Sequence, residues 1–496
     1  MIAVALFLCA CAAYWVWRRK DTKDTEPPRY PGAWPIIGNL HALFGNSCRI
    51  WTRLNIISEK LHEMGGVVTA SFGPQTVYIA CDPDDVFTIT NACLAKDDLY
   101  DFGKPFLGEG LVTAKASIWK NHRKLLNPSF NQSLLDTFMG VFNSQSRKLV
   151  QEMEKEDGKG PFDPWIYTRC NALETICLTS LGVEFTEMNI SPMQYLDAME
   201  KMFSATIERI IKIWWHSPYT FAFSLLKMKQ DECIKVLHNM SNTVLQKRKS
   251  EYARKVNAVR STTSGSKFKP FLDLILELSA EKGVFNDTEI REQVDTMIFG
   301  GHDTSSLVLV YAMILLGSHR EAQEKTFKEI QEVLGDGDRD VEKTDLSKLV
   351  YVEAVLKETI RVYTIAPVIA RKLDKDVKLK NYTLSAGRSC YLFLFGIHKH
   401  PMWGPDVHEF KPERWLEPGR LPDNPNAFAG FSYGRRNCIG KAYALMSMKT
   451  SLAHLIRRYQ VSADHTKMQL KMEVILKPHS GYFVSIEKRT KTINHG

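Results

Sequence analysis

The segment FSYGRRNCIG, residues 431–440, constrains the fold of this chain more than any other part of the sequence. It places Cys438 between Gly434 and Gly440, directly before an apolar helical pattern that starts near Ala442. A thiolate in that position is stabilised by the positive end of the helix dipole and by backbone N–H groups that glycines leave accessible. Most free cysteines are simply small buried residues. Five positions at this spacing arise by chance in roughly one chain in ten thousand, which favours a thiolate ligand over that alternative.

The composition is that of a large globular protein. The chain has 496 residues, of which 44% are hydrophobic and 24% are charged, so it can bury a sizeable core. Its net charge of +9 is spread along the chain, whereas a nucleic-acid footprint needs a dense basic stripe. Its 10 cysteines form no CxxC pair, and a chain of this length does not need disulfide bonds. We therefore expect a protein of a reducing compartment that binds no nucleic acid.

The N-terminus predicts a membrane anchor. Residues 1–17 form an unbroken apolar run that is followed at once by the basic sequence RRK. Such a run is close to the shortest helix that spans a bilayer, and basic residues behind it tend to stay in the cytoplasm. A cleaved signal peptide is the alternative, because Ala10-Cys11-Ala12 resembles a cleavage site, but the basic segment that should precede the apolar run is absent. We expect a retained transmembrane anchor with the remaining chain on the cytoplasmic side.

The rest of the chain predicts one large domain behind a hinge. Residues 18–38 combine the basic flank with the proline-rich sequence PPRYPGAWPIIG, which forbids regular helix and predicts a stiff hinge. Residues 39–496 show mainly helical periodicity, for example at 290–317 and 443–459. Residues 67–80 and 376–395 have the pattern of strands and predict small β-hairpins rather than a large sheet. The expected fold class is therefore mainly α with small β-sheets.

A second motif, FGGHDTSS, interrupts an otherwise apolar helical stretch with Asp303 and Thr304. It begins with Gly300-Gly301, and glycine inside a helix costs roughly 1 kcal/mol per residue. The pair therefore indicates that something approaches the backbone closely. A threonine inside a helix can also redirect local hydrogen bonds and open space for water or a diatomic ligand. For this residue alone, a threonine bonded to its own helix is the more ordinary interpretation.

Two further patterns place charged side chains on helices. Glu358 and Arg361 are three residues apart in VEAVLKETIRVY, and Arg414 follows in FKPERW. Such a pair alone is usually a weak surface contact. Trp119 and Arg123 are four residues apart in IWKNHRKLL and share one helical face, from which an indole N–H and a guanidinium can both reach a carboxylate. The ordinary alternative is a packed tryptophan beside a surface arginine.

In their order and spacing these motifs resemble those of the cytochrome P450 family, from Pro27 to beyond Gly440. The resemblance implies the cytochrome P450 fold and haem b, with Cys438 as the axial ligand of the metal and a thiolate that favours O–O cleavage. It also implies that Asp303 and Thr304 deliver protons to dioxygen. By the same resemblance, Phe431 shields the thiolate. The groups that bind the haem propionates are Trp119, Arg123, Arg371 and Arg436. A buried structural network is formed by Glu358, Arg361 and Arg414.

Within the family the chain is most similar to the microsomal family 4 branch of fatty-acid ω-hydroxylases, including its insect members. The similarity lies in VDTMIFGGHDTS, LGEGLVTAKASIWKNHRKLLNPSF and IHKHPMWGPDVHEFKPERW. Several members of that branch have a glutamate before GHDT that forms an ester with the haem, whereas this chain has Gly300. A covalent haem link from that position is therefore chemically impossible here.

The resemblance implies a monooxygenase that inserts one oxygen atom of O2 into a lipophilic substrate, which is a fatty acid, another lipid or a xenobiotic. The sequence has no flavin or nicotinamide fingerprint, so we expect electrons from NADPH-cytochrome P450 reductase, with cytochrome b5 as a candidate second partner. We expect the protein in the endoplasmic reticulum membrane, with its catalytic domain on the cytoplasmic side. Five basic residues flank the haem motifs and predict a docking face for the reductase: Lys120, Arg123, Lys124, Arg435 and Lys441.

Three alternatives stay open at the level of sequence. A haem-thiolate isomerase or dehydratase of lipid hydroperoxides needs no reductase, but typically lacks the Asp303-Thr304 pair. A catalytically silent, membrane-tethered carrier of apolar ligands would keep the fold as a binding pocket. The aromatic segment 210–227 is either part of the core or an element that faces lipid.

Overall fold

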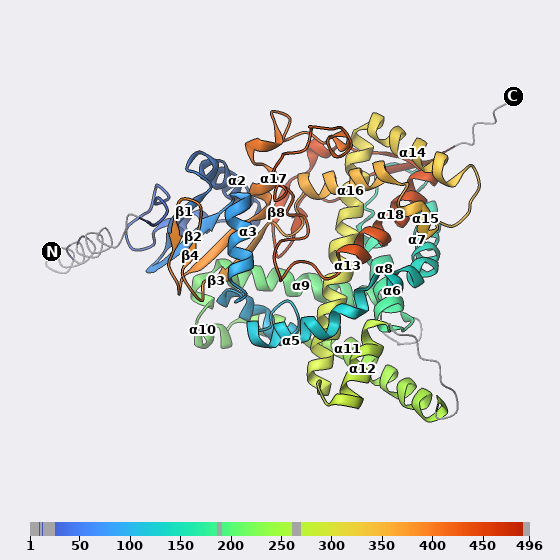
Figure 1. Cartoon of the computed structure of the whole chain (residues 1–496), viewed down its shortest axis with the longest axis horizontal. Coiled ribbons are helices and arrows are strands. Elements are labelled where there is room, and N and C mark those ends of the chain that lie inside the picture. The colour runs from blue at the N-terminus through green and yellow to red at the C-terminus, as the bar shows by residue number, and fades with distance from the viewer. Residues whose placement is uncertain (1–8, 10–11, 13–24, 186–190, 260–268, 490–496) are drawn as a thin grey trace.

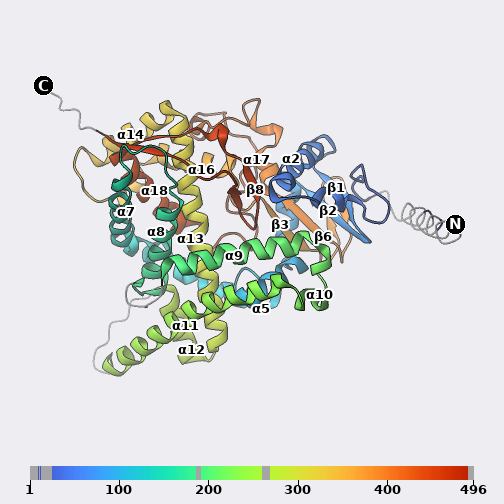
Figure 2. The same ribbon diagram turned by 180° about the vertical axis from the view of Figure 1, so that it is seen from behind.

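The computed structural model describes residues 9, 12, 25–185, 191–259 and 269–489. Apart from the two single residues, the expected anchor at 1–17 lies outside these ranges, as does the first part of the hinge at 18–24. The described chain forms a mainly helical body with a small sheet at one end (Figures 1 and 2). The predicted fold class, mainly α with small β-sheets, is confirmed.

The longer helices are α2 (Ser47–Glu63), α3 (Pro83–Ala92), α5 (Ala116–Leu126), α7 (Met139–Met153), α8 (Trp165–Ile176), α9 (Pro192–Ile211), α11 (Leu225–Val259), α12 (Phe271–Lys282), α13 (Asp287–Ser318), α14 (Arg320–Leu334), α16 (Val350–Val362) and α18 (Lys441–Arg458). Short helices are α4 (Lys104–Leu107), α6 (Gln132–Leu135), α10 (Pro218–Ala222), α15 (Lys343–Leu346) and α17 (Leu394–His398). The strands are β1 (Val67–Phe72), β2 (Gln75–Ala80), β3 (Val368–Lys372), β4 (Val377–Lys378), β5 (Thr383–Leu384), β6 (Ser389–Phe393), β7 (Tyr459–Ser462), β8 (Leu470–Met472), β9 (Leu476–Pro478) and β10 (Ser485–Lys488).

Helix α13 is the central helix of this body. It starts with a capping box, in which the side chains of Asn286 and Glu289 each accept a hydrogen bond from the backbone N–H of the other. It packs against α8, α11 and α16. Of the described helices, α13 alone is long and apolar enough to cross a membrane, but 72% of its most apolar window is buried in the protein. It is therefore a core helix, and the helix predicted at 290–317 is confirmed.

The sheet joins segments that are far apart in the chain. Strands β1 and β2 form the predicted hairpin, with Gly73 in its turn at a φ of 60°. The expectation of separate small hairpins is wrong for the later segment. Strand β6 pairs parallel with β2 and antiparallel with β3, which gives one four-stranded sheet in the order β1-β2-β6-β3. Strand β4 pairs with β5 instead, because the turn-rich sequence between them folds back locally.

Helices cover both faces of this sheet. Successive side chains of a strand point to opposite faces, and on β2 both sets are buried. Val77 and Ile79 pack with the apolar side of α2, whereas Tyr78 and Ala80 pack with α3. The buried part of β2 therefore has a continuous apolar sequence, rather than alternating apolar and polar residues.

The described part of the hinge is docked on the sheet. The Thr69 N–H donates to the Pro28 carbonyl, and the Tyr30 N–H donates to the Thr69 carbonyl, each at 2.8 Å. The buried Glu26 carboxylate pairs with Arg388 at 2.9 Å. These contacts fix the point at which the N-terminal segment meets the domain that we expect from residue 39 onwards.

Glu358 on α16 is fully buried and holds two arginines. Arg361 donates to both carboxylate oxygens at 2.8 and 2.9 Å, and Arg414 donates at 2.9 Å. The Trp415 indole N–H also donates to Glu358 at 2.9 Å. Arg361 donates further to three backbone carbonyls of the segment 398–409. The predicted buried network is confirmed, and it fastens the chain that leads toward the cysteine loop.

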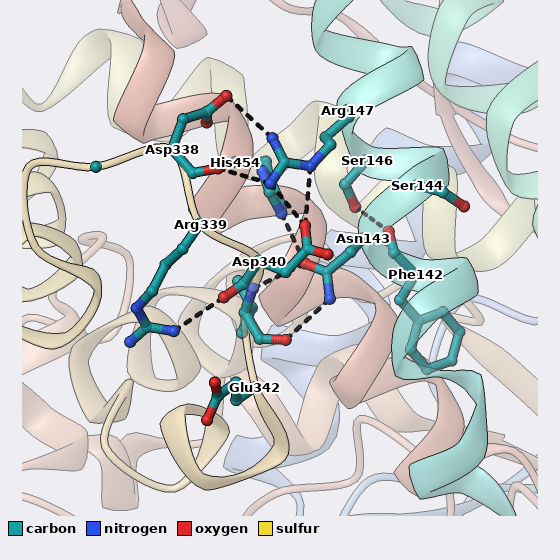
Figure 3. A network of polar contacts seen from close by, with 12 residues as sticks. Phe142, Asn143, Ser144, Ser146, Arg147, Asp338, Arg339, Asp340, Glu342 and His454 are labelled. Atoms are coloured by element: carbon teal, nitrogen blue, oxygen red, sulfur yellow. Dashed lines mark hydrogen bonds and ion pairs between the residues drawn. The ribbon is translucent and has the colours of Figure 1, made fainter.

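A second polar network fastens α18 to α7 and to the loop before α15 (Figure 3). The Asn143 amide donates to the Val341 carbonyl at 2.9 Å and accepts the Val341 N–H at 2.8 Å. The His454 ring of α18 contacts the same amide oxygen at 2.8 Å. Burial and the neighbouring Arg457 lower the pKa of His454 to about 4, so the ring is neutral near pH 7 and donates from one nitrogen.

Breaking the Glu358 network tests its contribution to stability. The change Glu358→Gln leaves two buried guanidiniums without their carboxylate, so we expect the free energy of unfolding to fall by about 3–5 kcal/mol in chemical denaturation. The control is Glu332→Gln on α14, where the carboxylate is exposed and lies 3.9 Å from Lys328; it should change the free energy by less than about 0.5 kcal/mol. Equal effects of the two changes would contradict a stabilising role for the buried network.

Candidate functional site

The loop that carries Cys438 closes on itself before α18. The Cys438 N–H donates to the Phe431 carbonyl at 3.0 Å. Gly434 has a φ of 69°, and a Cβ at this position would lie 2.7 Å from the Thr90 carbonyl oxygen, so only glycine fits. Helix α18 begins at Lys441. The structure therefore confirms a tight, glycine-dependent loop with a helix directly behind the cysteine.

The surroundings of Cys438 have opposing effects on the pKa of its thiol. Cys438 is exposed, yet protein atoms surround it closely, which means that its accessible surface faces the interior. Burial raises the pKa of the Cys438 thiol, whereas a hydrogen bond from the Gly440 N–H and the charges of Arg123 and Lys441 lower it. The loop thus offers a thiolate one backbone donor and two nearby cations.

Trp119 and Arg123 on α5 meet different partners. The Arg123 guanidinium donates to the backbone carbonyl of Asn437 at 2.8 Å and to its side-chain oxygen at 3.1 Å, and it braces the residue before Cys438. Trp119 is buried, and the Arg436 guanidinium stacks on its ring with Cζ 4.7 Å from the centroid. The helical spacing brings both residues to α5, but the structure joins only Trp119 to the predicted basic group.

Arg371 and Arg436 are buried cations whose hydrogen bonds are incomplete. Arg436 donates to the Ala114 carbonyl at 2.8 Å, while its Nε and Nη1 have no partner among the described residues. Arg371 donates to the Ala370 carbonyl at 3.1 Å, and its Nε has no partner within the part of the chain that the structure describes. Burial lowers the pKa of both guanidiniums, and for Arg436 burial and the charge of Arg371 together lower it to about 10. An anion bound here would accept hydrogen bonds from the unpaired nitrogen atoms of these two guanidiniums.

The structure adds Lys96 and Tyr100 to this basic group. A backbone bridge places Lys96 beside Arg371, and the Lys96 amine lies 4.2 Å from the centroid of the Tyr100 ring. The Tyr100 hydroxyl accepts the backbone N–H of Ala370, the residue before Arg371, at 3.5 Å. Sequence reasoning missed both residues, because neither stands at a fixed spacing from a motif. Only the pairing of the chain against β3 brings them to the site.

Thr304 and Gly300 share one face in the middle of α13. Gly300 is exposed and Thr304 is half-buried, although most residues of this helix are buried. The Thr304 hydroxyl donates to the Gly300 carbonyl at 2.9 Å. This is the ordinary bond of a threonine to its own helix. The accessible face nevertheless leaves the hydroxyl able to contact a ligand beside the helix.

Asp303 lies on a different, buried side of α13. Its carboxylate is 3.6 Å from the Lys477 amine and 3.8 Å from the Arg169 Nε, and neither oxygen has a hydrogen bond from a described residue. Arg169 in turn pairs with Glu200 at 2.9 Å, and Glu200 is partly exposed. Of the predicted pair, Thr304 therefore offers an accessible hydroxyl and Asp303 a buried carboxylate. Arg169 lies between this carboxylate and the partly exposed Glu200.

The two adjacent glycines of α13 have different surroundings. A Cβ on Gly301 would lie 2.6 Å from the Ile176 side chain of α8, so glycine is needed where the two helices cross. A Cβ on Gly300 would meet nothing within 4 Å. Only Gly301 confirms the prediction of a close approach to the backbone.

An apolar cavity of about 900 Å³ lies between the sheet, α2, α9 and α13. Phe299 of α13 and Val112 line it beside the site, and Leu43 and Ile213 line it elsewhere. Among the described residues that line it, Arg53 is the single lysine or arginine. Its guanidinium donates to the carbonyls of the 41–44 segment. Asp97, Asp98 and Glu473 also line the cavity, and most of its other lining residues are apolar. The cavity therefore suits a mainly apolar molecule.

A basic depression of about 700 Å³ lies over α5 and the cysteine loop. It is lined by four of the five residues that we predicted for a docking face, namely Lys120, Arg123, Lys124 and Arg435. The fifth, Lys441, lies at the start of α18 with its amine 5.7 Å from the Phe431 ring. The structure thus brings four of the five predicted basic residues to one open surface.

The two glycines give opposite predictions for stability. We expect Gly301→Ala to lower the free energy of unfolding by about 1–3 kcal/mol, because its methyl group overlaps Ile176. Gly300→Ala should raise it by up to about 1 kcal/mol, because alanine favours the helix and nothing obstructs it. Denaturant titration of both variants measures this. Relief of the Gly301→Ala loss by Ile176→Ala would assign the loss to the helix crossing, and equal signs for the two glycines would contradict the assignment.

The comparison with known proteins covers the whole site. The cytochrome P450 family matches residues 28–486. Cytochrome P450 4V2 of Mus musculus is 31% identical over 95% of this chain and 92% of its own. Cytochrome P450 4c21 of Blattella germanica is 30% identical over 98% of both chains, and cytochrome P450 4c3 of Drosophila melanogaster is 30% identical over 95% of this chain and 91% of its own. The helices, the cysteine loop and this similarity along nearly the full length agree, and the chain belongs to the cytochrome P450 family.

Proposed function

We propose that the Cys438 thiolate would hold the haem iron and that this chain thereby works as a haem-thiolate enzyme. As a cytochrome P450, the protein is a monooxygenase that contains haem b and inserts one oxygen atom of O2 into a lipophilic substrate. When bound, the haem supplies the redox chemistry that activates dioxygen. The observation that carries the assignment is the closed loop of Cys438, with a donor at Gly440 and cations at Arg123 and Lys441.

The buried basic group fits the two carboxylates of haem b. Arg371 and Arg436 have nitrogen atoms without partners, and Trp119 holds the Arg436 guanidinium in place. We assign these residues to the haem propionates, because charge-assisted bonds would satisfy the unpaired donors. Arg123 is assigned to the same end of the haem by resemblance, while its contacts with Asn437 support a second role in bracing the loop.

Two side chains of α13 have the properties of a proton relay. Thr304 would present its hydroxyl on the accessible face, and Asp303 would hold a proton beside it. The ion pair with Arg169, which itself pairs with the partly exposed Glu200, would position the Asp303 carboxylate without carrying the proton. A buried carboxylate with open acceptor positions can exchange protons through small movements or a water. Phe431 packs against the core beside the loop and is assigned to exclude water from the thiolate.

An exposed apolar surface supports membrane entry of the substrate. Residues 213–225 include a group of exposed apolar side chains, and Phe223 is 94% exposed. Helix α10 and the β1–β2 hairpin lie at the same end of the molecule (Figures 1 and 2). Ile213 belongs both to this group and to the lining of the apolar cavity. We infer location at the endoplasmic reticulum membrane, with the catalytic domain on the cytoplasmic side and lipophilic substrates entering from the bilayer.

The basic depression supports the site of electron delivery. A cytochrome P450 of this kind depends on a redox partner, and we propose NADPH-cytochrome P450 reductase, with cytochrome b5 as a second donor. Lys120, Lys124 and Arg435 line the depression next to the cysteine loop. Within the described chain they form no ion pair, so their charges are available to an acidic partner.

The haem ligand is tested by the absorption spectrum of the reduced protein with carbon monoxide. We expect a red-shifted Soret band in the wild type and its loss in Cys438→Ser, because only a thiolate ligand produces the shift. Met446 of α18 is not assigned to haem binding, so Met446→Leu serves as the control for handling and folding. A histidine-like band in the wild type, or folded wild type without haem, would defeat the assignment and favour the carrier.

Charge reversal tests the docking surface. The double change Lys120→Glu and Lys124→Glu should slow reductase-driven turnover by about tenfold or more through lost electrostatic attraction, while peroxide-driven turnover stays unchanged. Lys282→Glu at the exposed end of α12 is the matched control. Equal losses in both assays would show that the reversal disturbs the haem site rather than docking.

A further inference from the structure

The turn of the β8–β9 hairpin brings a carboxylate to the apolar cavity. Residues 472–474 line the cavity, and Glu473 stands between two apolar side chains there. Two hydrogen bonds at Leu476 hold the hairpin. Its N–H donates to the Ile365 carbonyl at 2.9 Å, and its carbonyl accepts the Tyr311 hydroxyl at 2.8 Å. Tyr311 belongs to α13, so the hairpin has a fixed position relative to the central helix.

The Glu473 carboxylate is buried and keeps one oxygen open. Its side chain is only 5% exposed, and Oε1 pairs with the Lys471 amine at 2.7 Å. Its Oε2 has no hydrogen-bond partner among the described residues. A buried acceptor without a donor is unfavourable. Because Lys471 already balances the charge of this carboxylate, a neutral hydroxyl suits the open oxygen better than a second cation does.

The charged lining of the cavity disfavours a second carboxylate. Counting Asp, Glu, Lys and Arg, the described lining has three acidic side chains, Asp97, Asp98 and Glu473, and one basic side chain, Arg53. The Arg53 guanidinium already donates to three backbone carbonyls of the segment 41–44. The carboxylate of a fatty acid would therefore meet like charges and a cation that is already hydrogen-bonded.

The same cavity extends from Glu473 to α13. Phe299 lines it and directly precedes Gly300, which shares the accessible face of α13 with Thr304. Most of the remaining lining is apolar. A molecule with a hydroxyl at Glu473 would therefore place its hydrocarbon part along the apolar lining, toward the accessible face of α13.

We propose that Glu473 accepts a hydrogen bond from a substrate hydroxyl, so that this enzyme prefers apolar alcohols to fatty acids. The inference rests on the proposed monooxygenase function and names the substrate class for it. Glu473 forms no covalent bond in this role. It selects the substrate and orients it, with the carbon atoms remote from the hydroxyl directed toward α13.

The test is the affinity of the full-length, haem-loaded protein for three probes with the same ten-carbon chain, measured by isothermal titration calorimetry. The probes are decan-1-ol, decyl methyl ether and decanoate. We expect the wild type to bind decan-1-ol at least about tenfold more tightly than the ether, because only the alcohol donates a charge-assisted hydrogen bond. Decanoate has no donor near neutral pH and should bind more weakly than the alcohol.

Three variants assign this preference to Glu473. The change Glu473→Met removes the acceptor but keeps the length of the side chain, so the alcohol and the ether should bind within about twofold of each other. Glu473→Gln keeps a neutral acceptor and should retain an intermediate preference; it also replaces Glu473→Met if that variant does not fold. Glu487→Gln makes the same chemical change at an exposed site on β10 and should leave all three affinities unchanged.

Several outcomes would overturn the proposal. These are equal wild-type affinities for the alcohol and the ether, a preference for the alcohol that survives Glu473→Met, or tighter binding of decanoate than of decan-1-ol. The last result would assign recognition to Arg53 instead.

The absorption band with carbon monoxide distinguishes this proposal from the one on which it rests. Absence of the thiolate band in the wild type would defeat the haem-thiolate function. An intact band with equal affinities for the alcohol and the ether would overturn the role of Glu473 alone.

Discussion

Glu358 makes the architecture around the cysteine loop possible, because one carboxylate allows two arginines to be buried. Arg361 and Arg414 use it as their common acceptor, and the Trp415 indole shares it. Arg361 donates its remaining N–H groups to backbone carbonyls of the segment 398–409, which precedes the cysteine loop. Irregular chain has few hydrogen bonds of its own. The network supplies them, and the segment that leads to the cysteine loop obtains a fixed position without regular secondary structure.

The same chemistry is left incomplete at the haem site. Glu358 satisfies its arginines, whereas Arg371, Arg436 and Lys96 form no ion pair with a carboxylate among the described residues, and Arg371 and Arg436 keep unpaired nitrogen atoms. A structural site gains stability from complete pairing, and a binding site needs donors that remain open for the ligand. Both groups contain buried arginines, so the presence of arginines does not tell them apart. Complete pairing marks the Glu358 network as structural, and incomplete pairing marks the other group as a cofactor site.

Helix α13 combines packing and chemistry in adjacent residues. Gly301 allows the close crossing with α8, while Gly300 and Thr304 form an accessible face. Asp303 points to the buried cations Arg169 and Lys477. Neighbouring residues of a helix point about 100° apart, so one motif can serve the helix crossing, the ligand and the proton path at once.

The sequence determined the features that rest on local spacing. It predicted the loop of Cys438, the helix behind it, the helix of Asp303 and Thr304, and the family itself. It also placed Glu358 and Arg361 together, because three residues span nearly one helical turn. The basic residues of α5 and of the cysteine loop were predicted to meet at one face, and the open depression contains four of them.

The tertiary structure decided the features that rest on contacts between distant segments. The pairing of β6 with β2 and β3 merged strands that we expected in separate hairpins, since register and partners depend on the packing of both faces. Arg123 binds Asn437, and Lys96 lies beside Arg371. Neither neighbour is fixed by spacing along the chain. Local periodicity specifies which face of an element a side chain occupies, but only the packed fold specifies what that face meets.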